Sequence, residues 1–372
     1  MATSIWKHFS AVPDPRVERT KLHKLEDILT ITICAVICGA ETWVDIADFG
    51  RAKESWLRTF LELPNGIPSH DTFDRVFAAL DTKGFEGCFQ DWVADLAGSS
   101  EGKLIAIDGK TIRRSIDRAS GKAAVHLVSA WVHENHAVFG QIRTEDKSNE
   151  ITAIPKLLEM LNLGKATVTI DAMGCQKDIA QKVLDRDGQY VLAVKANQAA
   201  LYEDIRTFLD DAIERDFQGL EHDLYELTEK GHGRIETRRC WTTSQIDWLR
   251  NRHDWPGLQS IAVVESRRQI GEQVSTERRY FISSLPGQTA QRIAVAVRNH
   301  WCVENELHWS LDVSFGEDQS RTRIRNAGEN LSRVRRIALM LLKQEKTAKV
   351  GVKAKRLMAG WDEKYLLRVL RI

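Results

Sequence analysis

The chain has 372 residues, which at roughly 100 to 200 residues per domain predicts two or three domains with a large core. Apolar residues make up 43% and charged residues 28%, which argues against a disordered, collagenous or disulfide-scaffold chain. The net charge of +1 conceals an asymmetry, because residues 319–372 contain 15 Lys and Arg against 4 Asp and Glu. Such a basic segment is typical of contact with nucleic acid or another anionic surface.

Residues 1–98 are predicted to be helical, since HKLEDILTITICAVICG and WVDIADFGRAKESWLRTFLEL carry apolar residues three and four apart. Ser69 or Asp71 is expected to cap a further helix. The apolar run Ile28 to Ala40 has 13 residues, short of the roughly 20 that a bilayer requires, so it predicts a buried helix and no membrane partner. The start of the chain has no secretory pattern and the six cysteines form no CxxC pair, which predicts reduced thiols and a cytoplasmic location.

The pattern changes at Gly102, where strands and helices begin to alternate. Strands are expected over 103–108, 125–134 and 137–146, the last two joined by a short turn. A helix over 150–163, a strand over 166–171, a helix over 175–188 and a strand over 189–197 follow. This order predicts an α/β fold with a mixed sheet flanked by helices.

Residues 220–285 form a second β-rich stretch, punctuated by turns at Gly231, Gly233 and Gly271. A long helix is expected to begin near Thr289 and to run through AQRIAVAVRNHWCVENELHWSL. The β-rich stretch therefore reads as an insertion between the sheet and a helix that returns to it.

Two predicted strands end in an acid, LIAID at Asp108 and TVTID at Asp171. Open α/β sheets bind ligands at the carboxyl ends of their strands, so neighbouring strands would bring both carboxylates to one site. Taken alone, each Asp is better explained as an ordinary turn or loop residue, because Asp is common in turns.

A third acid lies on the long helix, where His300, Glu304 and His308 fall on one stripe with Asp312 close to its line. A polar stripe on a buried helix must be paired, solvated or metal-bound, although a surface helix would carry the same residues without a role. Together Asp108, Asp171 and Glu304 form an all-oxygen set of the kind preferred by Mg²⁺ or Mn²⁺. Two such ions can stabilise the attacking and leaving oxygens of phosphodiester chemistry.

Basic residues near these acids and in the last part of the chain suggest a nucleic-acid partner. The hairpin of residues 230–239 and the segments 321–326, 333–336 and 343–356 suit phosphate contact, although solvated charged faces would look the same. DNA binding is therefore expected to depend steeply on salt and to be lost when residues after about 319 are removed. The residues expected to contact DNA are Lys110, Arg113, Arg114, His232, Arg234, Arg238, Arg239, His300, Trp301, His308, Arg321, Arg323 and Arg325.

Five motifs in order, AIDGKTIR, TIDAMGCQ, GHGRIETR, RYFISSL and HWCVENELHWSLDVSFGED, closely resemble the DDE transposases of bacterial insertion sequences, in the group of the H-repeat-associated proteins. PDPRVERTKLHKLEDIL and PSHDTFDRVFAALD are similar to the helical leading domain of that group. The resemblance covers nearly the whole chain and implies a ribonuclease-H-like core with Asp108, Asp171 and Glu304 as catalytic triad. It also implies two Mg²⁺ or Mn²⁺ ions, and cleavage followed by strand transfer at transposon ends.

On this reading the chain divides into a helical N-terminal domain (1–98), a catalytic domain (99–345) with its β insertion (220–285), and a basic C-terminal tail (346–372). The implied partner is double-stranded DNA at transposon ends and target, bound by a homodimer at the bacterial nucleoid. Many related transposases carry Tyr, Arg and Lys where this chain has Val297, His300 and Leu311, which leaves open whether a DNA hairpin forms. The alternatives are a nuclease of the same fold, a non-catalytic DNA-binding protein and, least favoured, a zinc hydrolase using His300 and His308.

Overall fold

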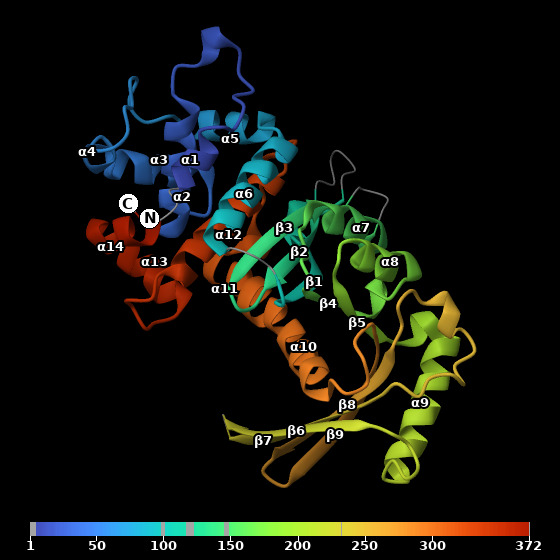
Figure 1. Cartoon of the computed structure of the whole chain (residues 1–372). Helices are drawn as coiled ribbons and strands as arrows, with labels where there is room; N and C mark the ends of the chain where they lie inside the picture. The colour runs from blue at the N-terminus through green and yellow to red at the C-terminus, as the bar shows by residue number, and fades with distance from the viewer. Residues whose placement is uncertain (1–4, 98–100, 117–122, 145–148, 232, 372) are drawn as a thin grey trace.

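The fold is described from a computed structural model that covers residues 5–97, 101–116, 123–144, 149–231 and 233–371 (Figure 1). Its leading region is helical, as the sequence predicts. The helices of this region are α1 (Ile5–Phe9), α2 (Leu25–Ile37), α3 (Trp43–Ala52), α4 (Glu54–Leu57), α5 (His70–Ala79) and α6 (Thr82–Ala97).

Local sequence signals explain where these helices lie. The apolar run that opens at Ile28 forms most of α2, in which every residue from Asp27 onward is buried. The side chain of Ser69 accepts a hydrogen bond from the backbone N–H of Thr72, so Ser69 caps α5 as expected. Thr42 and Asp45 form a reciprocal capping box at the start of α3. No helix among the described residues is long and apolar enough to cross a membrane.

A mixed sheet occupies the centre of the molecule. Its first five strands are β1 (Leu104–Thr111), β2 (His126–Val132), β3 (Ala137–Arg143), β4 (Thr167–Ile170) and β5 (Gln189–Val194). They lie in the order β3-β2-β1-β4-β5, with β1, β4 and β5 parallel to one another and β2 antiparallel to both neighbours. The helices that follow these strands are α7 (Glu150–Met160), α8 (Lys177–Asp185) and α9 (Ala199–Glu214).

The β-rich insertion continues the same sheet. It contributes β6 (Asp223–Gly231), β7 (Arg234–Thr243), β8 (Ser260–Ile270) and β9 (Gln273–Ser283), and β9 pairs antiparallel with β5. The sheet therefore has nine strands, in the order β3-β2-β1-β4-β5-β9-β8-β7-β6. In Figure 1 the long hairpins of the insertion extend away from the helical region.

The long helix returns to this sheet, but it is not one regular helix. It consists of α10 (Ala290–Cys302), a π-helical segment η6 (Val303–His308) and α11 (Trp309–Phe315). Helix α10 contacts β1, β4 and β5 as well as β6 and β7 of the insertion. Despite this π-helical segment, the predicted stripe holds together, since His300 and Glu304 line one cavity and His308 lies 3.9 Å from Glu304.

Of the C-terminal segments expected to lie against DNA phosphates, residues 333–336 and part of 343–356 are instead in the core, whereas Arg321, Arg323 and Arg325 are exposed. Helices α12 (Ala327–Gln344), α13 (Val352–Trp361) and α14 (Glu363–Leu370) share one hydrophobic core with helices α1–α3, α5 and α6. Arg333, Arg335 and Arg336 are 1%, 2% and 0% exposed. Arg333 donates to Glu86 at 2.6 Å, and Arg336 pairs with Glu317 at 3.1 Å.

This burial overturns the expectation for residues 333–336, because a guanidinium held inside the protein cannot reach a phosphate. Lys355 and Arg356 are also buried, and donate to the backbone carbonyls of Leu342 and Val36. Removing residues after about 319 would therefore take away part of the core, and loss of DNA binding in such a fragment would report unfolding.

Candidate active site

Asp108 lies on β1, directly after four buried apolar residues of the strand. Its side chain is 16% exposed. The next residue, Gly109, is closely packed, since a Cβ there would come within 2.0 Å of Glu150 Oε1 and 2.7 Å of His126 Nε2 and would force these side chains to shift. The sequence Asp-Gly at this point is thus set by close packing beside the acid, and is more than a turn.

Asp171 follows β4, the parallel neighbour of β1. Ile107 is paired with Ile170 in the register of these strands, so Asp108 and Asp171 occupy equivalent positions at the same end of the sheet. Asp171 caps the short helical turn after β4, where its Oδ1 accepts a hydrogen bond from the backbone N–H of Met173 at 3.0 Å. This bond fixes the carboxylate and leaves its second oxygen available to a ligand.

Glu304 approaches from η6, with its side chain 57% exposed. Its Oε2 lies 3.9 Å from Nδ1 of His308, and the same nitrogen lies 3.5 Å from Oδ2 of Asp108. Ligand atoms of Asp108, Glu304 and His308 all lie within 4.8 Å of one another, close enough to hold one metal ion.

The three acids line one cavity of about 170 Å³ between the ends of the strands and α10. Its walls also include Lys195 after β5. Two strand ends and η6, far apart in the sequence, thus deliver Asp108, Asp171 and Glu304 to a common space, as the sequence analysis anticipates.

The charge distribution around Asp108 favours a cation. Burial first, and then the nearby carboxylates of Glu304, Glu150 and Asp171, together raise the pKa of Asp108 to about 7, against the lowering effect of a hydrogen bond from the backbone of Gly109. Carboxylate oxygens are the preferred ligands of hard divalent ions, and such an ion would relieve this repulsion. The donor set therefore fits Mg²⁺ or Mn²⁺.

The two histidines of the predicted stripe have different surroundings, since His300 lines the carboxylate cavity whereas His308 does not and is buried. His308 is 5% exposed, and burial together with the charges of Arg336 and Lys110 lowers its pKa to about 3. Burial also lowers the pKa of His300, whose Nδ1 lies 3.0 Å from Thr169 Oγ1. Both are neutral imidazoles beside the acids, which suits positioning of carboxylates and metal ligation better than contact with DNA phosphates.

Lys110 is a further correction. Its side chain is 7% exposed and its ammonium lies 2.6 Å from Asp312 and 3.4 Å from Asp318. An ammonium enclosed by two carboxylates is not available to a phosphate. Lys110 instead ties β1 to α11 and to the turn that follows it.

Two residues beside Asp108 escape the sequence analysis. Glu150 is the first residue of α7 and its Oε1 lies 2.9 Å from Nε2 of His126, whose Nδ1 in turn lies 2.7 Å from Thr111 Oγ1. Neither belongs to a recognisable motif, and the contact of Glu150 with Gly109 exists only in the folded chain.

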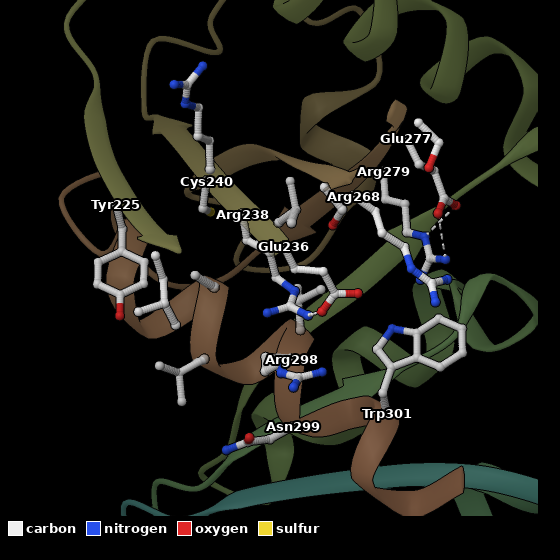
Figure 2. A pocket seen from close by; sticks show the side chains of 18 residues that line it. Tyr225, Glu236, Arg238, Cys240, Arg268, Glu277, Arg279, Arg298, Asn299 and Trp301 are labelled. Atoms are coloured by element: carbon white, nitrogen blue, oxygen red, sulfur yellow. Dashed lines mark hydrogen bonds and ion pairs between the residues drawn. The ribbon is translucent and has the colours of Figure 1, made fainter. Parts of the chain in front are cut away.

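A basic groove adjoins the carboxylate cavity. It has a volume of about 480 Å³ and lies between the insertion and α10, as Figure 2 shows. Trp301 and Arg279 line both spaces, and the Arg279 guanidinium stacks 4.5 Å from the Trp301 ring centroid. The groove also contains Arg268 and Arg298, which the sequence analysis does not single out.

Some of the insertion residues expected to contact DNA line this groove, but acidic side chains pair with them. Arg238 and Arg239 line the groove, but Arg238 pairs with Glu229 and Glu236, and Arg239 with Glu226. Arg234 lies beside Glu236 at 3.6 Å. His232 lies outside the described residues.

The remaining cations lie on the surface. Arg113 is 83% exposed and close to Asp318, and Arg323 donates to the backbone carbonyl of Arg114. Arg321 and Arg325 are exposed as well. Of the positions that differ from related transposases, Leu311 lies in the core and Val297 lines the carboxylate cavity.

Comparison with known proteins identifies the family. A family model described as the transposase DDE domain matches residues 99–341, and the model of its associated N-terminal region matches residues 6–93. The chain is 43% identical to the "H repeat-associated putative transposase YhhI" of Escherichia coli K12, over 98% of this chain and 97% of that protein. It is 50% identical to an "uncharacterized protein in dhlA 3'region" of Xanthobacter autotrophicus, over 74% of this chain and 92% of that one.

Among solved structures, a piggyBac transposase synaptic complex with hairpin DNA matches with a TM-score of 0.41 and 10% identity, over 99% of this chain and 80% of that chain. Likeness at this level carries no argument about the fold or the site. The two family models and the full-length relatives place this chain in the DDE transposase family.

Proposed function

We propose that this protein is a DNA transposase that cleaves and joins the ends of an insertion sequence, with Asp108, Asp171 and Glu304 as its catalytic acids. The observation that carries the proposal is the convergence of these three carboxylates on one cavity, from the ends of two parallel strands and from η6. The order β3-β2-β1-β4-β5 supports a ribonuclease-H-like core within residues 99–345, with β6–β9 as its insertion.

The three acids would hold two Mg²⁺ or Mn²⁺ ions. When bound, such a pair supplies charge stabilisation to the attacking and leaving oxygens of a phosphodiester. Asp108 must lose its proton to ligate, and its raised pKa means that ligation competes with protonation below about pH 7. Asp171 is held in place by the N–H of Met173, while the exposed Glu304 completes the set.

The groove beside the cavity would guide DNA to the acids. Arg268 presents a guanidinium group suited to phosphates, Arg279 and Arg298 add cations that are paired with Glu277 and near Glu229, and Trp301 offers a ring face at the boundary between groove and cavity. In Figure 2 Trp301 on α10 faces Arg279 on β9. The exposed Arg113, Arg321, Arg323 and Arg325 provide a separate basic surface for the same polyanion.

The division into a helical region (1–98), a catalytic domain (99–345) and a C-terminal segment (346–372) also remains a proposal. The shared core of α2, α12 and α14 supports treating the first and last of these, together with α12 from the end of 99–345, as one helical unit. Paired-end cleavage requires two active sites, so we expect a homodimer on DNA, acting in the bacterial cytoplasm at the nucleoid.

The test is cleavage and strand transfer on DNA that carries the inverted repeats flanking the gene. Asp108→Asn, Asp171→Asn and Glu304→Gln should each abolish Mg²⁺-dependent cleavage while binding to the same DNA persists. Asp187→Asn is the matched control, because Asp187 is an exposed acid before β5, at the opposite end of the strands from Asp171. Full cleavage by Asp171→Asn would remove that residue from the site, and cleavage without joining would identify a nuclease.

A further inference from the structure

A second cluster of potential metal ligands lies around Glu306, away from the carboxylate cavity. His133 and His136 flank the turn between β2 and β3, and Glu306 reaches them from η6. Nδ1 of His133 lies 3.3 Å from Oε1 of Glu306, and Nδ1 of His136 lies 2.7 Å from Oε2. The side chains are between 24% and 35% exposed, so the cluster is accessible to a small ion.

The spacing of these atoms resembles that of a metal site. Zinc–nitrogen and zinc–oxygen bonds of 2.0 to 2.1 Å in a tetrahedron separate neighbouring ligand atoms by about 3.3 Å. The His133–Glu306 distance is 3.3 Å, and all three ligand atoms lie within 4.8 Å of one another. Nδ1 of His133 is buried and makes no hydrogen bond within the described part of the chain. This nitrogen therefore faces Glu306 without a hydrogen-bond partner among the described residues.

We propose that His133, His136 and Glu306 bind a divalent transition-metal ion, with zinc the best match to two imidazoles and one carboxylate. Three protein ligands leave a fourth position for water or for the thiol of Cys302, which lies one helical turn before Glu306. The alternative is a simple ion-pair network in which Glu306 is satisfied by protonated histidines.

Lys343 is the group that sets the affinity of this site. Its ammonium lies 3.2 Å from Oε2 of Glu306 and 5.5 Å from the centroid of the Trp131 ring. This contact orients the carboxylate so that Oε1 faces His133, yet its positive charge opposes a second cation. Removing the charge should therefore tighten metal binding, whereas it would only weaken an ion-pair network.

Binding would connect two elements that matter for the candidate active site. The ion would join the β2–β3 turn to η6, and Glu304 lies on the same π-helical segment two residues before Glu306. The site would thus hold the irregular backbone from which Glu304 projects. This inference does not depend on the proposed function, because the cluster shares no residue with the candidate catalytic set.

The test uses the full chain with Asp108→Asn and Glu304→Gln, which disable the other candidate ion site. Calorimetric titration with Zn²⁺ and the visible absorption of bound Co²⁺ should show one equivalent bound. His133→Gln, His136→Gln or Glu306→Gln should each weaken binding by about tenfold or more, and Lys343→Met should tighten it by about tenfold. His253→Gln is the matched control, because His253 is an exposed histidine in the insertion.

One measurement uses the protein with His133, His136 and Glu306 intact, so its result does not depend on a cluster substitution that causes misfolding. X-ray absorption at the zinc edge of the doubly substituted protein should show two imidazole ligands. The proposal fails if this protein binds no more Zn²⁺ than one that also lacks His133 and His136, or if the absorption edge shows no imidazole. Cleavage by the wild-type chain is measured separately, so failure here and failure of the transposase assignment are distinguishable.

Discussion

Replacing Asp108 by Asn should stabilise the metal-free protein at alkaline pH while destroying its function. In the folded chain the pKa of Asp108 is about 7, whereas an unperturbed Asp has a value of 3.8. The folded state therefore binds the proton more tightly than the unfolded state. Stability contributed by the protonated carboxyl is lost as the pH rises through this window, and Asn has no proton to lose.

The size of the effect follows from the shift. Three pKa units at 1.36 kcal/mol each correspond to about 4 kcal/mol above pH 8 and close to zero at pH 4. Asp108 is only 16% exposed, so solvent screening removes little of this. For a chain of 372 residues, about 4 kcal/mol corresponds to roughly 5 °C in thermal midpoint.

The assay is thermal unfolding of wild type and Asp108→Asn in EDTA at pH 4, 6 and 8. Adding Mn²⁺ at 100 times its dissociation constant should stabilise the wild type by about 2.7 kcal/mol and the variant far less. A midpoint difference that is the same at pH 4 and pH 8 would refute the reasoning.

Three further predictions follow from contacts described above. Gly109→Ala should destabilise the chain and abolish cleavage, because its Cβ would collide with Glu150; unchanged thermal unfolding would show that Glu150 moves aside. Arg336→Met should lower the free energy of unfolding by about 3–5 kcal/mol, because it leaves Glu317 charged and buried. In a urea titration, adding Glu317→Gln should restore most of this loss. If the double variant shows no recovery, the pair is not the cause. Arg298→Ala should reduce the salt slope of DNA binding by about one; an unchanged slope would place the DNA elsewhere.

The sequence predicts the strands well because their apolar runs are short and bounded by turns. Strands β2–β9 fall within the expected segments, whereas β1 continues to Thr111, three residues past its expected end, and Ser69 caps α5 as its position implies. Which strands pair with one another could not be predicted in the same way. The continuation of β5 into β9 depends on contacts between residues about ninety apart, so the insertion could not be assigned to the central sheet. Helix α9 (Ala199–Glu214) is absent from the prediction.

In the candidate site, too, the positions of residues were predictable but their surroundings were not. Strand endings place Asp108 and Asp171 correctly relative to the sheet, but the environment of each side chain depends on distant partners. Lys110 and Arg333 look like DNA-binding cations in the sequence and prove to be buried, because Asp312 and Glu86 neutralise them from elsewhere in the fold. Helical spacing correctly groups Glu304 with His300 and His308, but the π-helical turn at Val303 has no periodic signature and is absent from the prediction.

The hydrophobic core shared by the first and last helices determines when the N-terminal helices can be buried during synthesis. Helix α2 is buried against α12, more than 280 residues later in the chain, so the N-terminal helices leave the ribosome long before the surface that covers them exists. Their apolar faces stay exposed during synthesis of the whole catalytic sheet. We therefore expect nascent chains to engage chaperones until α12 emerges, and copies of the gene with premature stop codons before that helix to yield aggregates rather than DNA-binding fragments.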